Sequence, residues 1–167
     1  MFAFTLALLA SLVVAAPAPA DEGHLVNRAY GASFRWRHGG NPGMQRTLVT
    51  CGGGPGVGYN NGDKVSLGSP VTRYCNPSWE VGNNHIISVN DPKRCLDSTL
   101  NPGNGVQPHL WECLGDVPQQ KWTYRKDGTI RLEGKNLCLD VTDGNAANKV
   151  QMWECDPNNP NQQWDRV

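Results

Sequence analysis

The stretches RCLDSTLNPGNGVQPHLWEC (94–113) and LCLDVTDGNAANKVQMWEC (137–155) are two copies of one unit, and each copy is followed by a QxW triplet. The cysteines that open the two copies are 43 residues apart, and the tryptophans of the triplets, Trp122 and Trp164, are 42 residues apart. A third, eroded copy lies upstream, because Trp79 precedes Trp122 by 43 residues. A fixed period of this length is typical of a repeat architecture, in which each copy is one supersecondary unit.

Turn-forming residues bound short alternating segments, such as residues 129–132 (TIRL), and this pattern predicts repeated hairpins. One such unit cannot bury its own apolar face. Three units can close around a common axis and share a core with one tryptophan from each copy, namely Trp79, Trp122 and Trp164. Residues 34–37 (FRWR) also alternate and can supply the first strand. The period alone leaves a three-fold barrel, a short solenoid and a partial propeller as alternatives.

The composition favours a single non-helical domain with a neutral ligand. The 167 residues suit one domain, and 19 glycines and 12 prolines argue against an all-helical protein. The 15 Lys and Arg residues balance 15 Asp and Glu residues. This balance argues against nucleic acid and an anionic membrane surface as partners.

The first twenty residues have the pattern of a secretory signal peptide. An apolar run covers residues 2–16, which is too short for a transmembrane helix. The small residues 18–20 (APA) then form a cleavage pattern. We therefore expect a signal peptide over residues 1–20, a mature domain over residues 21–167, and a secreted, extracellular protein.

Six cysteines fit this expectation, because an oxidising compartment turns an even number of cysteines into disulfide bonds. Cys51 lies 44 residues before Cys95, and two cysteines flank the variable loop of each copy. We expect pairing within each copy, worth roughly 3 kcal/mol per bond, with pairing between copies as the alternative. The expected pairs are Cys51 with Cys75, Cys95 with Cys113, and Cys138 with Cys155. No cysteine or histidine spacing is that of a zinc site, so neither metal nor cofactor is expected.

In the second and third copies, one predicted strand carries a tryptophan on the face that points away from the core. In the third copy, Val150 and Met152 fall on the core-facing side of a period-two strand, whereas Gln151 and Trp153 point together to the opposite face. The second copy repeats this alternation in residues 109–111 (HLW). An outward tryptophan beside a hydrogen-bonding side chain can stack on an apolar patch of a ligand while polar groups orient it.

The aspartates that follow each Cys-Leu pair, Asp97 and Asp140, complete this pattern. A carboxylate accepts hydroxyl donors, and an amide such as Asn161 or Gln162 both donates and accepts. A hexose presents vicinal hydroxyls together with a C–H face, so this combination predicts a sugar site. The alternatives are that the aspartates stabilise a turn and that Gln120 and Gln162 lock the turn rather than touch a ligand.

The ordered CLD, WEC and QxW motifs resemble those of the ricin B-chain-like lectins. The match is close over residues 94–167, holds in outline over 39–80 and is slight over 21–38. The resemblance implies an all-β fold, the β-trefoil, stapled by disulfides and built from three pseudo-symmetric repeats of about 43 residues, the first of them degenerate. The implied repeats are residues 37–79, 80–122 and 123–164.

The resemblance also implies which residues bind the sugar. The family uses the aspartate after the first cysteine, a glutamine and an aromatic residue before the second, and the Asn-Gln pair that opens QxW. The third repeat keeps all of these as Asp140, Gln151, Trp153, Asn161 and Gln162. The second repeat has Asp97, His109, Trp111, Gln119 and Gln120. In the first repeat Gly53 replaces the aspartate, Tyr74 precedes Cys75 and Pro77 replaces the glutamine, so no active site is expected there.

The leading hypothesis is a secreted lectin, not an enzyme, that binds galactose-type or related glycans through the second and third repeats. A small hydrolase is one alternative, but it requires paired carboxylates, and Asp140 and Asp143 lie too close in one turn to predict a cleft. A protein-binding trefoil such as a protease inhibitor is another, with the glycine-rich loop 51–63 as the place for its partner.

Overall fold

The chain folds into short β-strands, as its turn-rich sequence predicts. The computed structural model describes residues 29–38, 46–52, 58–68, 75–82, 84–88, 91–145 and 149–167, and the expected signal peptide lies outside this part of the chain. The strands are β1 (Ala29–Ala32), β2 (Phe34–Trp36), β3 (Thr47–Cys51), β4 (Val65–Gly68), β5 (Cys75–Asn76), β6 (Trp79–Gly82), β7 (His85–Ser88), β8 (Arg94–Asp97), β9 (His109–Glu112), β10 (Trp122–Tyr124), β11 (Ile130–Leu132), β12 (Leu137–Val141), β13 (Val150–Glu154) and β14 (Trp164–Arg166). Helical structure among the described residues is limited to the 3-10 turns η1 (Pro118–Gln120), η2 (Thr142–Gly144) and η3 (Pro160–Gln162).

Three antiparallel sheets share one layout. The strand orders are β6-β7-β8-β9, β10-β11-β12-β13 and β14-β2-β3-β4, with β1 added to β6 and β5 added to β3. Each order begins with a strand whose first residue is a tryptophan. The period in the sequence therefore corresponds to a four-stranded unit in the structure.

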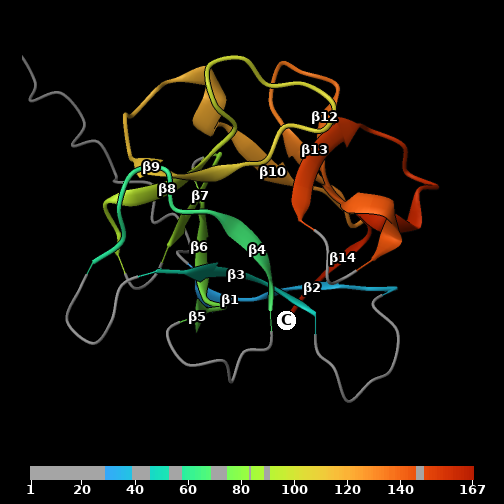
Figure 1. The fold of residues 1–167 in the computed structure, drawn as a ribbon, viewed down its shortest axis with the longest axis horizontal. Helices are drawn as coiled ribbons and strands as arrows, with labels where there is room; N and C mark the ends of the chain where they lie inside the picture. Colours follow the sequence, from blue (N-terminus) through green and yellow to red (C-terminus); the bar gives the residue numbers. More distant parts are fainter. Residues whose placement is uncertain are drawn as a thin grey trace, which may run out of the picture.

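The last strand completes the first sheet, which closes the three sheets around a common axis. β14 pairs with β2, with Trp164 opposite Trp36, and Figure 1 shows these two strands side by side although they lie at opposite ends of the described chain. Adjacent repeats are joined where Trp122 N–H donates to Asn84 O at 2.6 Å and Trp164 N–H donates to Gly128 O at 2.9 Å. This closure is that of a β-trefoil rather than of a solenoid or an open propeller.

Three tryptophans at equivalent positions form the centre of the core. All three are fully buried. Each donates its indole N–H to a leucine carbonyl of its own repeat: Trp79 to Leu48 at 3.0 Å, Trp122 to Leu96 at 3.0 Å and Trp164 to Leu139 at 3.2 Å. A buried indole combines a large apolar area with one donor that needs a partner, and here the same partner serves in every repeat. The prediction that these tryptophans belong to a shared core is confirmed.

The hydrogen-bonded leucines show which residues of the three repeats are equivalent. Each leucine lies opposite an apolar residue of the next strand: Leu48 opposite Leu67, Leu96 opposite Leu110 and Leu139 opposite Met152. Counted from this leucine, Val49 in β3 takes the place that Asp97 takes in β8. The prediction gave this place to Gly53, which lies outside the described residues, whereas the register gives it to Val49. It failed because Cys51 lies four residues beyond the place that Cys95 has in its repeat.

The three disulfide bonds form within repeats, as predicted. Cys51 pairs with Cys75, Cys95 with Cys113 and Cys138 with Cys155, at sequence separations of 24, 18 and 17 residues. The second and third bonds hold equivalent places, where the Cys-Leu strand meets the end of the WEC strand. The first bond joins the end of β3 to β5 instead. Closing loops of this size constrains the unfolded chain by roughly 3 kcal/mol per bond.

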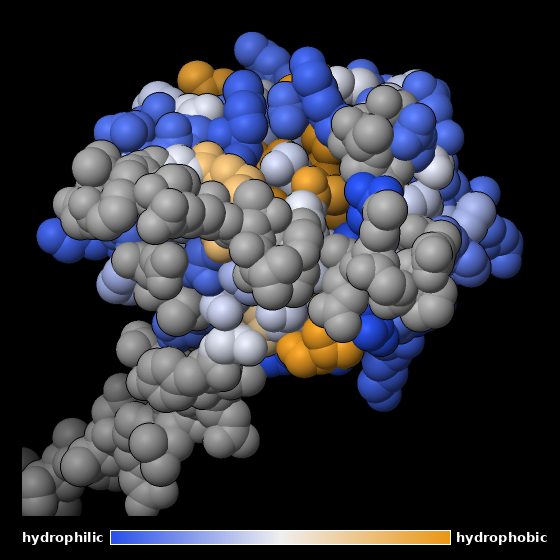
Figure 2. Space-filling model, turned by 60° about the horizontal axis from the view of Figure 1, so that its bottom comes forward, coloured by the Kyte–Doolittle hydropathy of each residue, from blue (hydrophilic) through white to orange (hydrophobic). Residues whose placement is uncertain are grey.

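Core and surface residues alternate along the strands. Phe34 and Trp36 are buried in β2, so this segment forms a core strand, but it is not the first strand as predicted, because β1 precedes it. In β13, Val150 and Met152 are fully buried, whereas Trp153 is 43 % exposed. Among the residues coloured in Figure 2, those toward the outside of the view are mostly hydrophilic, and hydrophobic ones are visible near its centre and at its lower edge. An outward tryptophan beside hydrogen-bonding side chains is a candidate ligand contact.

Candidate functional site

The third repeat carries an open hollow of about 210 Å³ beside β12 and β13. Its lining consists of Asp140, Thr142, Asp143, Gln151, Trp153, Asn159 and Asn161. Four of the five residues predicted for this repeat are therefore brought together, and Gln162 is not among them. The hollow also contains Asn159, which the sequence reasoning missed, and both Asp140 and Asp143, which had been judged too close in one turn to predict a cleft.

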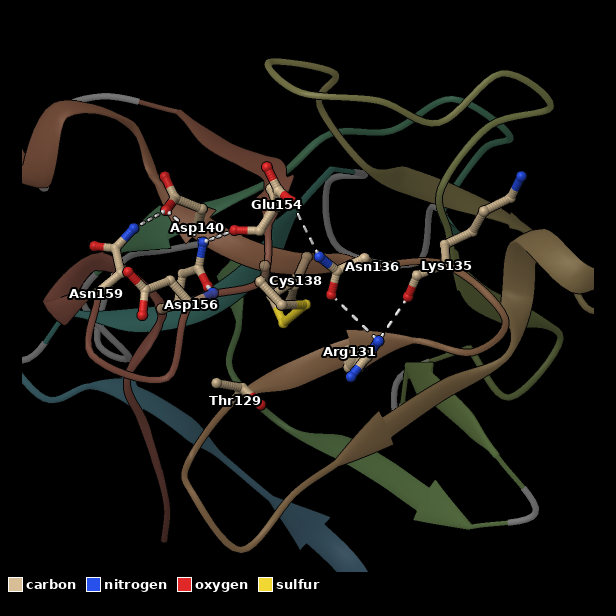
Figure 3. The surroundings of a disulfide bond; sticks show 12 residues. Thr129, Arg131, Lys135, Asn136, Cys138, Asp140, Glu154, Asp156 and Asn159 are labelled. Atoms are coloured by element: carbon tan, nitrogen blue, oxygen red, sulfur yellow. Dashed lines mark hydrogen bonds between the residues drawn. A yellow bond between two sulfur atoms is a disulfide. The ribbon is translucent and has the colours of Figure 1, made fainter.

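Three side-chain amides fix the Asp140 carboxylate. Gln151 Nε2 donates to Oδ1 at 2.9 Å, while Asn159 Nδ2 and Gln162 Nε2 donate to Oδ2 at 3.1 and 3.2 Å. Figure 3 shows Asn159 pointing toward Asp140 near Cys138. A carboxylate has about four acceptor sites, so the three amides leave room for about one further donor from the hollow.

The hollow also changes the acidity of Asp140. Burial raises the pKa of Asp140 above the ordinary aspartate value, the three amide donors oppose this effect, and the nearby charge of Asp143 adds to it. Asp140 is therefore protonated at a higher pH than an exposed aspartate. The raised pKa means that burial destabilises the charged form of the Asp140 carboxylate in the free protein. A hydroxyl group that donates to this carboxylate would stabilise the charged form.

Trp153 and Asn161 stand at the rim of the same hollow. Trp153 comes from β13, where the period-two alternation turns it away from the core. Asn161 belongs to η3, and its N–H donates to Asn159 Oδ1 at 2.9 Å. The φ of Gly144 is +61°, which favours glycine, and a Cβ there would lie 2.8 Å from Asn161 Oδ1, so a larger residue would displace the Asn161 side chain.

Gln162 and Gln120 lie beneath the hollows and not in them. Both are fully buried. Each glutamine spans the turn that precedes its tryptophan strand: Gln162 Nε2 donates to Glu154 O at 2.9 Å and Oε1 accepts Asp156 N–H at 2.9 Å, and Gln120 bonds Glu112 O at 2.8 Å and Leu114 N–H at 2.9 Å in the same way. Their predicted contact with a sugar is incompatible with this burial. The alternative that these glutamines lock the turn is correct, and each of them also donates to the aspartate of its hollow.

The second repeat has a larger hollow, of about 520 Å³. Its lining consists of Asp97, Thr99, Leu100, Asn101, His109, Trp111, Leu114 and Gln119. Four of the five predicted residues again come together, with Gln120 underneath. Trp111 is 36 % exposed, as the alternation in β9 predicts.

Asp97 is held differently from Asp140. Its Oδ1 accepts Thr99 N–H at 2.7 Å, and its Oδ2 accepts Gln120 Nε2–H at 2.9 Å. Thr99 has a φ of +72°, which is strained for a β-branched residue. The turn-stabilising alternative therefore describes part of the role of Asp97, since its carboxylate holds Thr99 in this conformation while it still lines the hollow.

His109 takes the place of Gln151 in the second hollow. Its Nε2 lies 3.6 Å from Asp97 Oδ1, and its ring lies edge-on to Trp111 with 5.5 Å between centroids. Burial lowers the pKa of His109, the Asp97 carboxylate opposes this shift, and the charge of Lys64 adds to it. His109 is therefore neutral over more of the pH range than an exposed histidine, with one donor and one acceptor as in an amide.

The first repeat lacks the groups that form the other two hollows. By register, Val49, Ser66 and Gly68 stand in the places of Asp140, Gln151 and Trp153. A Cβ at Gly68 would lie 2.8 Å from Val49 Cγ2, so a larger residue here would force this valine to shift. Pro77 is among the described residues and replaces the buried glutamine, while Tyr74 lies outside them. The expectation that this repeat has no comparable site is consistent with these replacements.

Two asparagines of preceding repeats bind the strands that carry the outward tryptophans, which the sequence reasoning missed. Asn61 Oδ1 accepts Glu112 N–H and Asn104 Oδ1 accepts Glu154 N–H, each at 2.8 Å. Each asparagine precedes a glycine whose N–H donates to the same neighbouring strand. The Asn-Gly pairs at 61–62 and 104–105 were the available signal, but a turn dipeptide does not reveal which strand it contacts.

Within the described ranges, no group of three or more His, Cys, Asp or Glu side chains is placed to hold a metal ion. The same part of the chain contains no helix with the length and apolar character needed to cross a membrane.

Comparison with known sequences gives a match to the ricin-type beta-trefoil lectin domain over residues 58–164. An uncharacterized protein of Mycobacterium tuberculosis is 34 % identical over 91 residues, which are 53 % of this chain and 54 % of that protein. The chain thus spans about half the length of this curated relative.

Solved structures with the same fold include two with sugars bound. A non-toxic homologue of type II RIPs from Momordica charantia, in complex with α-methyl-D-galactoside, has a TM-score of 0.60 at 18 % identity, covering 83 % of this chain and 48 % of that chain. The β-trefoil lectin of the Vibrio vulnificus hemolysin/cytolysin, with N-acetyl-D-lactosamine bound, has a TM-score of 0.59 at 18 % identity, covering 83 % and 95 %. At this identity the likeness establishes the β-trefoil fold.

Proposed function

Because the chain belongs to the ricin-type β-trefoil lectin family, we propose that it is a lectin that binds galactose-type or related glycans through the hollows of its second and third repeats. One observation carries the proposal. In both hollows a fixed aspartate carboxylate, a second hydrogen-bonding side chain and a half-exposed indole line one open space. The ligands of the Momordica and Vibrio proteins, a galactoside and N-acetyl-lactosamine, support galactose-type sugars as the first class to test.

The proposed binding uses the two faces of a sugar ring. The C–H face stacks on Trp153 or Trp111, because an aromatic ring is a good partner for an apolar patch. Hydroxyl groups on the edge donate to Asp140 or Asp97, whose positions are fixed before the sugar arrives. A fixed acceptor needs no ordering on binding, which lowers the entropic cost of association. The proposed activity is reversible binding with no chemical step.

Each hollow alone should bind weakly, and the pair should act together on clustered glycans. An open hollow with one stacking face and a few hydrogen bonds leaves little free energy after the cost of association. Two hollows on one rigid domain can raise the avidity by about 10²-fold or more where both engage one surface.

We also propose that the protein is secreted. The apolar run over residues 2–16 and the APA segment at 18–20 support export. The three disulfide bonds are consistent with an oxidising compartment. Mass spectrometry of protein from the culture medium should find Asp21 as the first residue, whereas an intact Met1 on intracellular protein would contradict export.

The experiment that tests the lectin proposal is a glycan array with the oxidised protein, repeated with a chelator and with the double variant Asp97→Ala/Asp140→Ala. We expect metal-independent binding to galactose-type glycans that the double variant loses. A second double variant, Trp111→Ala/Trp153→Ala, removes the stacking faces without touching the hydrogen bonds of the turns. Both variants should lose binding while circular dichroism stays that of the parent, and unchanged binding in the second would overturn the proposal.

A further inference from the structure

Three of the five large hydrophobic side chains exposed among the described residues gather at the second hollow. Leu100 is 83 % exposed, Leu114 43 % and Trp111 36 %, and all three line the hollow. Exposed apolar residues normally occur singly, and a cluster beside polar groups marks a binding surface.

The third hollow provides a matched comparison, because the strands that carry the aspartate and the tryptophan pair in the same register in both repeats. Gln120 and Gln162 make the same backbone bonds, which fixes the register of the turns that follow the second cysteines. In this register two polar residues of the third repeat are replaced by apolar ones, Asp156 by Leu114 and Asn159 by Val117. Counted from the two aspartates, Leu100 stands three residues after Asp97, where Asp143 stands three residues after Asp140. A carboxylate and an indole line both hollows, so the change is confined to the residues around them.

The replacements change which kind of ligand group fits beside the aspartate and tryptophan of each repeat. In the third repeat, Asn159 donates to the Asp140 carboxylate and Asp156 accepts Asn158 N–H at 2.8 Å within its own turn. In the second repeat Leu114 lines the hollow instead. The second hollow is also larger, at about 520 Å³ against about 210 Å³. An apolar group beside Asp143 would desolvate a charge, whereas beside Leu100 it would bury apolar surface.

From these observations we propose that the second-repeat hollow is a site for glycosides that carry an apolar substituent, such as an aryl aglycone, while the third-repeat hollow takes the sugar ring alone. The inference rests on the proposed lectin function, since the sugar must first be seated at Asp97 and Trp111. The aglycone then covers Leu100 and Leu114. The occupant is a glycoside and not a free hydrocarbon, because Asp97, His109 and Gln119 line the same space and need polar partners.

The test compares methyl and phenyl β-glycosides of galactose, N-acetylgalactosamine, glucose, mannose and xylose by calorimetry. Trp153→Ala leaves only the second hollow and Trp111→Ala leaves only the third. We expect the phenyl glycoside to bind about tenfold more tightly than the methyl glycoside in Trp153→Ala, and less than about twofold more tightly in Trp111→Ala. Tenfold corresponds to about 1.4 kcal/mol, which requires roughly 55 Å² of buried apolar area.

A second set of variants assigns the preference to the leucines. Leu100→Asp/Leu114→Asp, made on Trp153→Ala, gives the second repeat the acidic residues that the third repeat has as Asp143 and Asp156, and the phenyl-to-methyl ratio should fall below about twofold. Val167→Asp replaces an exposed apolar residue that lines neither hollow and should keep the ratio near tenfold. Equal ratios in both hollows, or a tenfold ratio that survives the double substitution, would overturn this inference and leave the lectin proposal standing. Absence of any methyl glycoside or array binding would overturn both.

Discussion

The first and third repeats have the same frame and different outer faces. Trp79 and Trp164 are both fully buried and donate to equivalent leucine carbonyls at 3.0 and 3.2 Å. On the opposite face of the same strands, the third repeat carries a carboxylate, an amide and an indole where the first carries Val49, Ser66 and Gly68. Because side chains alternate between the two faces of a strand, the inner face can be kept while the outer face changes. The frame is therefore independent of the site that it carries.

The largest effect expected is a loss of stability when a core tryptophan is truncated, and this loss should be equal in the two repeats. Trp79→Ala and Trp164→Ala should each lower the free energy of unfolding by about 3–5 kcal/mol, the usual cost of truncating a buried aromatic residue. Urea unfolding of the oxidised protein measures both values. Trp79→Phe and Trp164→Phe keep most of the apolar area and should cost less. A loss in Trp79→Ala below half of that in Trp164→Ala would show that the first repeat does not share the frame equally.

The next effect should differ between the two repeats, because the third has a buried glutamine where the first has Pro77. Gln162→Ala removes bonds to Glu154 O, Asp156 N–H and Asp140. It should lower the free energy of unfolding by about 2–3 kcal/mol and weaken sugar binding at the third hollow through Asp140. Pro77→Ala at the equivalent place of the first repeat should cost at most about 1 kcal/mol. Thermal unfolding and calorimetry measure both, and full sugar affinity in Gln162→Ala would contradict its support of Asp140.

The frame could be predicted from the sequence because its signals are local and periodic. The spacing of Trp79, Trp122 and Trp164 predicted one core residue per repeat, and all three are buried. The alternation in β13 predicted that Trp153 points outward, which follows from strand geometry alone. Cysteines flanking one loop predicted the disulfide pairs.

The parts that could not be predicted depend on depth and on contacts between repeats. The QxW motif does not show that Gln162 lies under Asp140, because a strand-turn pattern gives sequence order and not depth. Val49 was missed because the spacing from the first cysteine does not hold in the first repeat: the cysteine is the last residue of β3 but the second residue of β8. The contact of Asn104 with β13 joins residues 50 positions apart, and no local pattern encodes it.

A smaller effect tests why the first repeat cannot carry an indole. Gly68→Ala should lower the free energy of unfolding by about 1–2 kcal/mol, because the new Cβ would lie 2.8 Å from Val49 Cγ2 in a packed strand. Val49→Ala removes the obstructing methyl groups, so the double variant should be more stable than the sum of the single effects by about 1 kcal/mol. Gly103→Ala, where a Cβ would meet nothing within 4 Å, is the matched control and should change stability by less than about 0.5 kcal/mol. Additive effects in the cycle would contradict the steric explanation.

The smallest effect expected is a pH dependence that the third repeat has and the first, with Val49, does not. Burial raises the pKa of Asp140, so the folded chain binds a proton here at pH values where the unfolded chain has already lost it. The contribution of Asp140 to stability therefore increases as the pH falls through its folded pKa, and the difference in unfolding free energy between the parent and Asp140→Asn should change in that direction. Sugar binding in Trp111→Ala should change in the opposite direction, because a protonated carboxyl group loses an acceptor site. This loss should begin above the ordinary aspartate pKa of about 3.9. Binding that stays constant down to that pH would show that the Asp140 charge does not contribute to binding, and a constant stability difference would show that its pKa is not raised by folding.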